Sequence, residues 1–185
     1  MVYLIGGPPR CGKSVLANRL TTDHAIPVIP TDLIWSLLEV SQPEWRIPMQ
    51  KGPDRIPRAA AMFEPYLEQA IRFLQPVQRG YSIEGEVITP ETAARLSSTY
   101  DLRVAFLVRS SVTAADIADS RGPNPWLENA PPDLVSAVSA EIISWSSHAL
   151  SACRKLSLPC FDVAGDFDRA IRDAASALMA DARPA

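Results

Sequence analysis

The sequence is poor in the residues that most often build metal and disulfide sites. It has 3 cysteines and 2 histidines in 185 residues, and no two cysteines have the C-x-x-C spacing. Zinc sites and thioredoxin-type redox centres therefore have no support. The few cysteines also argue against a disulfide scaffold, so a reduced, cytoplasmic setting is expected.

Long apolar runs and a strong net charge are absent as well. No stretch approaches the ~20 apolar residues that span a bilayer, and the apolar run at residues 2–5 is too short for a secretory signal. The formal net charge is −3, whereas nucleic-acid-binding domains usually carry a basic face. We therefore expect neither a membrane nor a nucleic acid as partner, and we expect a monomer or homodimer.

What the sequence does have is a regular alternation of short apolar runs and longer helical patterns. The expected strands are residues 1–5, 26–29, 81–83, 103–108 and 159–161, and the expected helices are 14–20, 33–40, 63–74, 134–153 and 167–178. Pro65 should kink the third of these helices or mark its start. Alternation of this kind predicts a parallel sheet covered by helices, and the length favours a single domain spanning residues 1–185.

Two segments have no regular pattern. Residues 42–58 and 110–132 are rich in proline, and the first also carries several basic residues. Long irregular segments inside a compact domain are usually functional loops or lids. We expect residues 42–58 to form a loop on the side of a substrate and residues 110–132 to form a lid.

Residues 7–14 carry the most specific motif, G-x-x-x-x-G-K-[ST]. It follows an apolar strand and precedes a helix, which is the setting that a phosphate-binding loop requires. Its glycines let backbone N–H groups point at phosphate oxygens, at the positive end of the following helix. The predicted nucleotide-binding residues of this loop are Gly7, Pro8, Pro9, Arg10, Cys11, Gly12, Lys13, Ser14 and Val15.

The motif also predicts individual roles. Lys13 should reach the β- and γ-phosphates of ATP, and the Ser14 hydroxyl should bind Mg²⁺. The sequence has no Asn-Lys-x-Asp motif to read guanine, so we expect ATP rather than GTP. An accidental glycine-rich turn is the alternative interpretation, and the surrounding strand and helix argue against it.

With these residues placed, the chain resembles the nucleoside-kinase-like group of P-loop proteins, which includes adenylate, shikimate and gluconate kinases and the chloramphenicol phosphotransferases. The resemblance is specific at the opening strand and phosphate loop, and elsewhere it concerns the order of elements. It implies a three-layer α/β fold whose five-stranded parallel sheet has the order 2-3-1-4-5, with helices on both faces and a small lid. It also implies an acceptor between strands 2 and 3, and an adenine site near the loop after strand 5, where Gly165 lies.

In such kinases an acidic residue often follows strand 2, and Asp32 matches that position. A carboxylate there can take or orient the proton of an alcohol acceptor, although Asp32 can also be the N-cap of the helix that follows. Glu84 closes strand 3, where an acidic residue usually holds the water shell of the metal. Because Glu84 is not an aspartate at the end of a long apolar run, it can instead contact the acceptor; Glu86 is a weaker candidate.

The resemblance also implies arginines that act on the nucleotide and its phosphoryl group. Arg121 would close with the lid over the transferred phosphoryl group, and Arg109 would bind nucleotide at the base of the lid. Independently of the resemblance, the local excess of basic residues at 42–58 suggests that Arg46, Arg55 and Arg58 bind an acceptor that bears a carboxylate or phosphate. Surface arginines of a solvated loop are the alternative for each of them.

These observations favour an ATP- and Mg²⁺-dependent phosphotransferase acting on a hydroxyl of a small molecule. A nucleoside monophosphate kinase, whose acceptor is a phosphate, is a related alternative. A nucleotide-binding regulatory protein that hydrolyses ATP slowly belongs to another class. The sequence does not name the acceptor.

Overall fold

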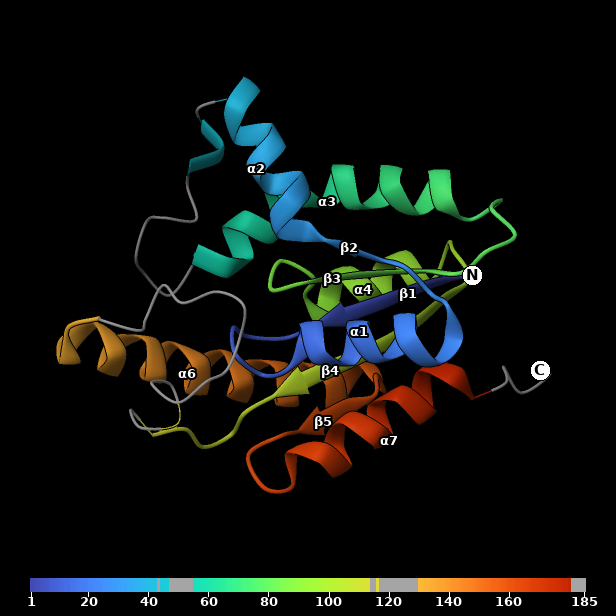
Figure 1. Ribbon diagram of the computed structural model, residues 1–185. Coiled ribbons are helices and arrows are strands. Elements are labelled where there is room, and N and C mark those ends of the chain that lie inside the picture. The colour runs from blue at the N-terminus through green and yellow to red at the C-terminus, as the bar shows by residue number, and fades with distance from the viewer. Residues whose placement is uncertain (43, 47–54, 114–115, 117–129, 181–185) are drawn as a thin grey trace.

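The computed structural model describes residues 1–42, 44–46, 55–113, 116 and 130–180. Within these ranges strands and helices alternate as the sequence predicts (Figure 1). In chain order the elements are β1 (Val2–Gly6), α1 (Lys13–His24), β2 (Val28–Pro30), α2 (Thr31–Ser41), α3 (Arg55–Leu74), β3 (Tyr81–Gly85), α4 (Pro90–Ser97), β4 (Leu102–Val108), α6 (Pro132–Leu156), β5 (Cys160–Asp162) and α7 (Phe167–Met179).

The five strands form one parallel sheet in the order β2-β3-β1-β4-β5. This confirms the predicted fold class and strand order. The register brings the carboxyl ends of the central strands level, because Ile5 of β1 and Pro30 of β2 both lie opposite Glu84 of β3. In open parallel sheets, ligands bind at this edge.

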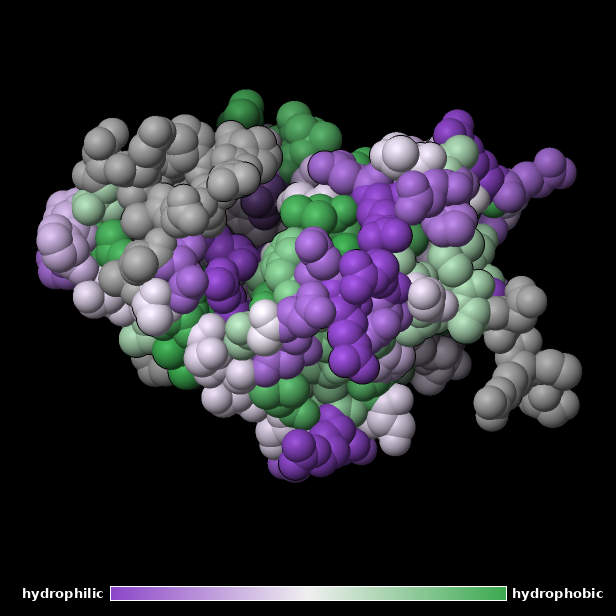
Figure 2. Space-filling view, turned by 60° about the horizontal axis from the view of Figure 1, so that its bottom comes forward, coloured by the Kyte–Doolittle hydropathy of each residue, from purple (hydrophilic) through white to green (hydrophobic). Residues whose placement is uncertain are grey.

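Alternate residues of the central strands point to opposite faces of the sheet, as a period of two requires. In β1, Val2 and Leu4 pack with α3 and α4, whereas Tyr3 and Ile5 pack with α1 and α7. The sheet is thus covered on both faces, and every residue of β1 is buried. On the face shown in Figure 2, hydrophilic and hydrophobic residues are interspersed. No helix in the described part of the chain is both long and apolar enough to cross a membrane.

The start of β2 differs from the prediction by two residues. Ala25 adopts a left-handed conformation (φ 55°) at the end of α1, and the N–H of Ile26 donates to the carbonyl of Leu20 at 3.2 Å. The N–H of Ala25 itself donates to the carbonyl of Thr21 at 3.1 Å, which is the bond of an αL cap. Ile26 therefore closes α1, and the strand begins only at Val28.

Two helices also differ from the prediction. Helix α3 begins at Arg55, so residues 55–58 are helical and not part of an irregular loop. Pro65 lies inside α3 on its exposed side and does not mark its start. Helix α4 was not expected at all, although Thr89 caps it by accepting from the N–H of Thr92, and Pro90 opens it. Both are helix-start signals.

The first residues of two other helices, α6 and α2, also test the sequence predictions. Helix α6 begins at Pro132, as the Pro-Pro pair predicts. Helix α2 begins at Thr31 with Pro30 as its N-cap, so the N-cap interpretation of Asp32 is wrong. Asp32 instead lies in the first turn of α2, where a negative charge is favourable. The helix thus holds its carboxylate at the carboxyl end of β2.

Candidate active site

The loop between β1 and α1 has the backbone of an anion-binding nest. Gly7, Arg10 and Gly12 have positive φ values of 138°, 58° and 89°. Such turns direct successive N–H groups into one concavity. Gly7 is also confined sterically, because a Cβ atom there would lie 2.0 Å from the carbonyl oxygen of Leu107. The loop therefore packs its backbone directly on the end of β4.

Gly12 is the N-cap of α1 and offers no side chain to the first turn of that helix. The N–H groups of the first turn have no partner within a helix, so they are left for a ligand at the positive end of the dipole. A Cβ at Gly12 would lie 2.8 Å from Cε2 of Phe167 and 3.1 Å from Cδ1 of Ile171. Helix α7 thus supports the loop from behind.

Two side chains of the loop bind its own backbone. Lys13 Nζ donates to the carbonyl of Pro8 at 2.8 Å, and Cys11 Sγ donates to the same oxygen at 2.9 Å. Burial raises the pKa of the Cys11 thiol, which therefore stays protonated and unreactive. Only the backbone of Cys11 can face a phosphate, whereas the partly exposed Lys13 can turn towards one.

Ser14 and Glu84 meet across the strand ends. Ser14 Oγ donates to Glu84 Oε1 at 3.0 Å, although the two residues lie 70 positions apart. Glu84 is 8% exposed. Burial raises the pKa of Glu84 and outweighs the positive charge of Lys13 and the bond from Ser14, which lower it. The buried carboxylate is thus favourable to a nearby cation.

Asp32 faces the same region from the start of α2. Partial burial of its carboxyl raises the pKa of Asp32, the negative charge of Glu86 adds to this, and Lys13 opposes it. The neighbouring Thr31 hydroxyl is buried and has no hydrogen-bond partner in the described part of the chain. It packs against Gly85, where a Cβ would lie 1.7 Å from Thr31 Oγ1. Gly85 thus lets α2 sit directly on the end of β3.

The residues fit Mg²⁺ with a nucleotide. The nest and the first turn of α1 suit phosphate oxygens, and the Ser14 hydroxyl and Glu84 carboxylate are oxygen ligands that suit Mg²⁺. Mg²⁺ usually takes one or two protein oxygens together with water and substrate phosphates. In the described residues no cluster of three His, Cys, Asp or Glu side chains could hold a metal alone.

The predicted acceptor residue Arg55 is already engaged by carboxylates. Its guanidinium contacts Glu86 through Nη1 at 2.7 Å and Glu141 through Nε at 2.8 Å. Burial lowers the pKa of Arg55, but the two carboxylates more than offset this, so the pKa is raised. Its charge is neutralised within the protein, which weakens the argument for an anionic acceptor.

The other predicted arginines are dispersed. Arg46 lies in a short turn after α2, and Arg58 lies on α3; both residues are exposed. Arg121 lies outside the described residues, as does most of the predicted lid. Arg109 follows β4, and its N–H donates to Ser146 Oγ at 2.9 Å while its guanidinium lies 3.5 Å from Asp116.

The loop after β5 is open at the predicted adenine position. Gly165 is exposed, and a Cβ there would meet nothing within 4 Å. Asp162 ties this loop to the end of β4, because its Oδ1 accepts from the N–H groups of Ser110 and Ala164. The two segments predicted to flank the adenine are thus joined.

Sequence reasoning missed two residues at this edge. Phe167 fits the apolar pattern of the last helix, yet it is 37% exposed and its ring covers Gly12. In the sequence, Glu141 looks like one of several solvent-exposed charges on a long helix, yet it forms an ion pair with Arg55. Neither residue has a local signal, because only the packing of α6 and α7 brings them to the site.

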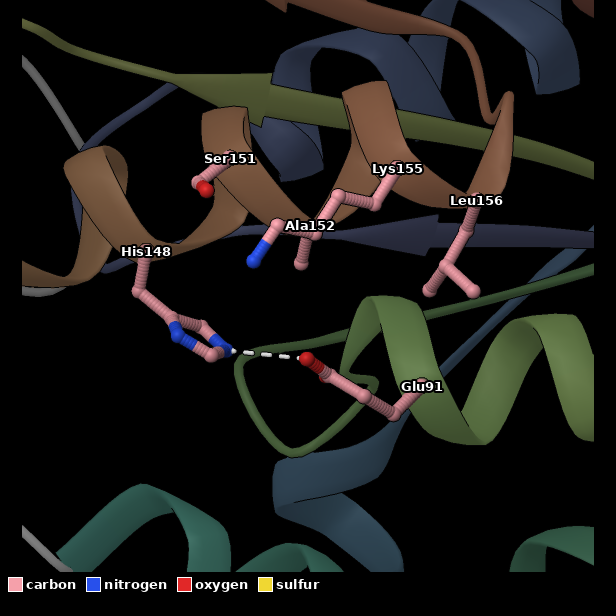
Figure 3. Close-up of a pocket in the computed structure, with 6 residues that line it drawn as sticks. All are labelled: Glu91, His148, Ser151, Ala152, Lys155 and Leu156. Carbon is pink, nitrogen blue, oxygen red and sulfur yellow. Dashed lines mark ion pairs between the residues drawn. The ribbon is translucent and has the colours of Figure 1, made fainter.

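A separate cavity lies between α4 and α6. Its volume is about 240 Å³, and its lining includes the ion pair of His148 with Glu91 at 3.2 Å (Figure 3). Every residue that lines it belongs to one of these two helices. None belongs to the phosphate loop or to the carboxylates around it, so this cavity is distinct from the candidate active site.

No protein-family model matches the chain, and no curated protein matches its sequence. Solved structures match the fold over most of both chains. A gluconokinase from Sinorhizobium meliloti is 14% identical with a TM-score of 0.50, covering 96% of this chain and 90% of its own. A shikimate kinase from Acinetobacter baumannii, solved with shikimate, is 12% identical with a TM-score of 0.54, covering 95% and 88%. A sugar kinase from a Janibacter species is 10% identical with a TM-score of 0.54, covering 96% and 93%. The chain therefore has the fold of the P-loop small-molecule kinases.

Proposed function

From this fold, we propose that the protein is a small-molecule kinase that transfers the γ-phosphoryl group of Mg²⁺-bound ATP to a hydroxyl group. One observation carries the proposal. The phosphate loop, the Ser14–Glu84 pair and Asp32 converge at the carboxyl ends of β1, β2 and β3. In-line phosphoryl transfer requires the nucleotide and the acceptor to bind next to each other, and both predicted sites lie at this edge of the sheet.

Each residue has a role that its position supports. The nest and Lys13 would bind the phosphates, with Lys13 leaving the Pro8 carbonyl to do so. Ser14 and Glu84 would hold Mg²⁺ and its water. When bound, Mg²⁺·ATP supplies the phosphoryl group and screens its charge. Asp32 would orient the acceptor hydroxyl and accept its proton.

The nucleotide side would extend along β4 and β5. Arg109 and the loop with Gly165 would hold the adenine side, and their backbones are already joined through Asp162. Arg121 stays a prediction for the phosphoryl group. We also keep Arg46 and Arg58 as acceptor-side predictions.

The test is ADP release with a panel of hydroxylated acids, sugars, nucleosides, nucleoside monophosphates and hydroxylated antibiotics. We expect at least one compound to accelerate ADP release by the wild-type protein, and Lys13→Ala to abolish that acceleration. Lys13 makes one partly exposed hydrogen bond, worth about 1 kcal/mol, so the variant should stay folded. Arg19→Ala, which removes an exposed surface ion pair from the same helix, is the matched control and should behave like wild type.

The alternatives give different results. Acceleration by nucleoside monophosphates alone would support a monophosphate kinase. ADP release that no acceptor changes would support a regulatory ATPase. Full activity in folded Lys13→Ala protein would refute a phosphate-loop mechanism altogether.

A further inference from the structure

Arg55 breaks a local rule of helix structure. It occupies the first position of α3, where the positive end of the helix dipole disfavours a cation. Positions that violate local preferences are often functional. Here two carboxylates from distant parts of the chain compensate for the violation, and Arg55 retains only 13% exposure of its side chain.

The two carboxylates hold Arg55 differently. Glu86 binds the guanidinium in a bidentate manner: Nη1 donates to Oε1 at 2.7 Å, and Nη2 donates to Oε2 at 3.3 Å. Glu141 uses only Oε1, which lies 2.8 Å from Nε and 2.6 Å from Nη2. The Glu86 side chain is 22% exposed and that of Glu141 is 45% exposed. Charge-assisted bonds of this bidentate kind fix orientation as well as distance.

The bidentate contact between Arg55 and Glu86 matters for the candidate active site because Glu86 lies close to Glu84 in the sequence. Glu86 follows the last residue of β3, and Glu84, which pairs with Ser14, precedes Gly85. Glu84 and Gly85 are paired with β1, and Glu84 also lies opposite Pro30 of β2, whereas Glu86 lies beyond the strand. The bidentate contact with Arg55 therefore restrains the chain at the point where it leaves the sheet.

We propose that Arg55 is a positioning residue: by binding Glu86, the first residue beyond β3, it holds the carboxyl end of this strand and with it the Glu84 carboxylate next to Ser14. This inference rests on the proposed function, because it assigns Arg55 to the support of the Mg²⁺ site and not to an anionic acceptor. Groups that hydrogen-bond a metal ligand directly commonly change metal affinity ~10–100-fold when they are lost. Arg55 acts one contact further out, through Glu86, so ~10-fold, the low end of this range, is the effect to look for.

The chain offers a matched control. Glu86→Gln and Glu141→Gln each remove one carboxylate from Arg55, but only Glu86 is covalently continuous with β3. A purely structural role for the cluster would make the two variants alike. The proposed role predicts that Arg55→Gln and Glu86→Gln disturb the Mg²⁺ site and that Glu141→Gln leaves it near wild type.

The first measurement needs no ligand. Amide hydrogen exchange at residues 86–88, just beyond β3, should be faster in Arg55→Gln and Glu86→Gln than in wild type, and nearly unchanged in Glu141→Gln. Exchange at these residues that is the same in all four proteins would overturn the proposal.

The second measurement is the Mg²⁺ concentration that gives half-maximal binding of a non-hydrolysable ATP analogue, determined by calorimetry. We expect Arg55→Gln and Glu86→Gln to raise it ~10-fold, Glu141→Gln to leave it within about twofold, and Arg55→Lys to fall between, because lysine keeps the charge but not the bidentate contact. If Arg55→Gln does not fold, Arg55→Lys and Glu86→Gln are compared with Glu141→Gln and wild type instead. An unchanged Mg²⁺ requirement in folded Glu86→Gln protein would refute the positioning role. Failure of the wild-type protein to bind the analogue would instead refute the proposed function.

Discussion

Replacing Gly12 with alanine should damage the phosphate loop in two separable ways. Gly12 has φ 89°, and a Cβ there would lie 2.8 Å from Cε2 and 2.9 Å from Cζ of Phe167. The backbone strain is worth ~1–3 kcal/mol, and overpacking adds ~1–3 kcal/mol. We therefore expect a loss of roughly 2–6 kcal/mol in the free energy of unfolding. For a chain of this size that lowers the Tm by about 5–20 °C.

A second-site variant separates the two contributions. Phe167→Ala removes the clashing ring and leaves the backbone strain, so the double variant should be more stable than the sum of the two single changes predicts. Neighbouring residues that share a steric conflict show coupling of ~0.5–3 kcal/mol in such cycles. Strict additivity would show that Phe167 is not what confines Gly12.

Gly165→Ala is the control for the substitution itself. Gly165 is open and its φ is not left-handed, so alanine should change stability by no more than about 0.5 kcal/mol. The assay is thermal unfolding followed by circular dichroism, with ATP-analogue binding on the same samples. A Tm for Gly12→Ala within about 2 °C of that for Gly165→Ala would refute the loop geometry.

Two further predictions concern the carboxylates. Asp32→Asn should lower acceptor-dependent kcat ~10²-fold or more with little change in Tm or ATP affinity; full activity in a stable variant would remove Asp32 from the mechanism. Glu84→Gln should weaken Mg²⁺-dependent nucleotide binding yet keep or raise the Tm at pH 7. The folded-state pKa of Glu84 is raised, so the contribution of this group to stability is present below its unfolded pKa of about 4.3 and is lost as the pH rises through the folded pKa. The Tm advantage of Gln should therefore shrink as the pH falls towards 4; an advantage that grows at low pH would contradict this reasoning.

Local sequence patterns were enough to predict the fold class and the phosphate loop. The alternation of apolar runs with helical spacing predicted the parallel sheet, and the glycines at 7 and 12 predicted a backbone that only a left-handed turn provides. Element boundaries were less accurate. Ile26 fits the apolar pattern of a strand, yet its N–H donates to the carbonyl of Leu20 at the end of α1.

Only the tertiary structure decided which charges meet. Ser14 and Glu84 are 70 residues apart, and Arg55 and Glu141 are 86 apart. Their pairing follows from strand order and helix packing, which no local spacing encodes. The basic residues between 42 and 58 suggested an anionic acceptor, yet the fold neutralises Arg55 inside the protein, because a largely buried guanidinium is stable only when carboxylates surround it.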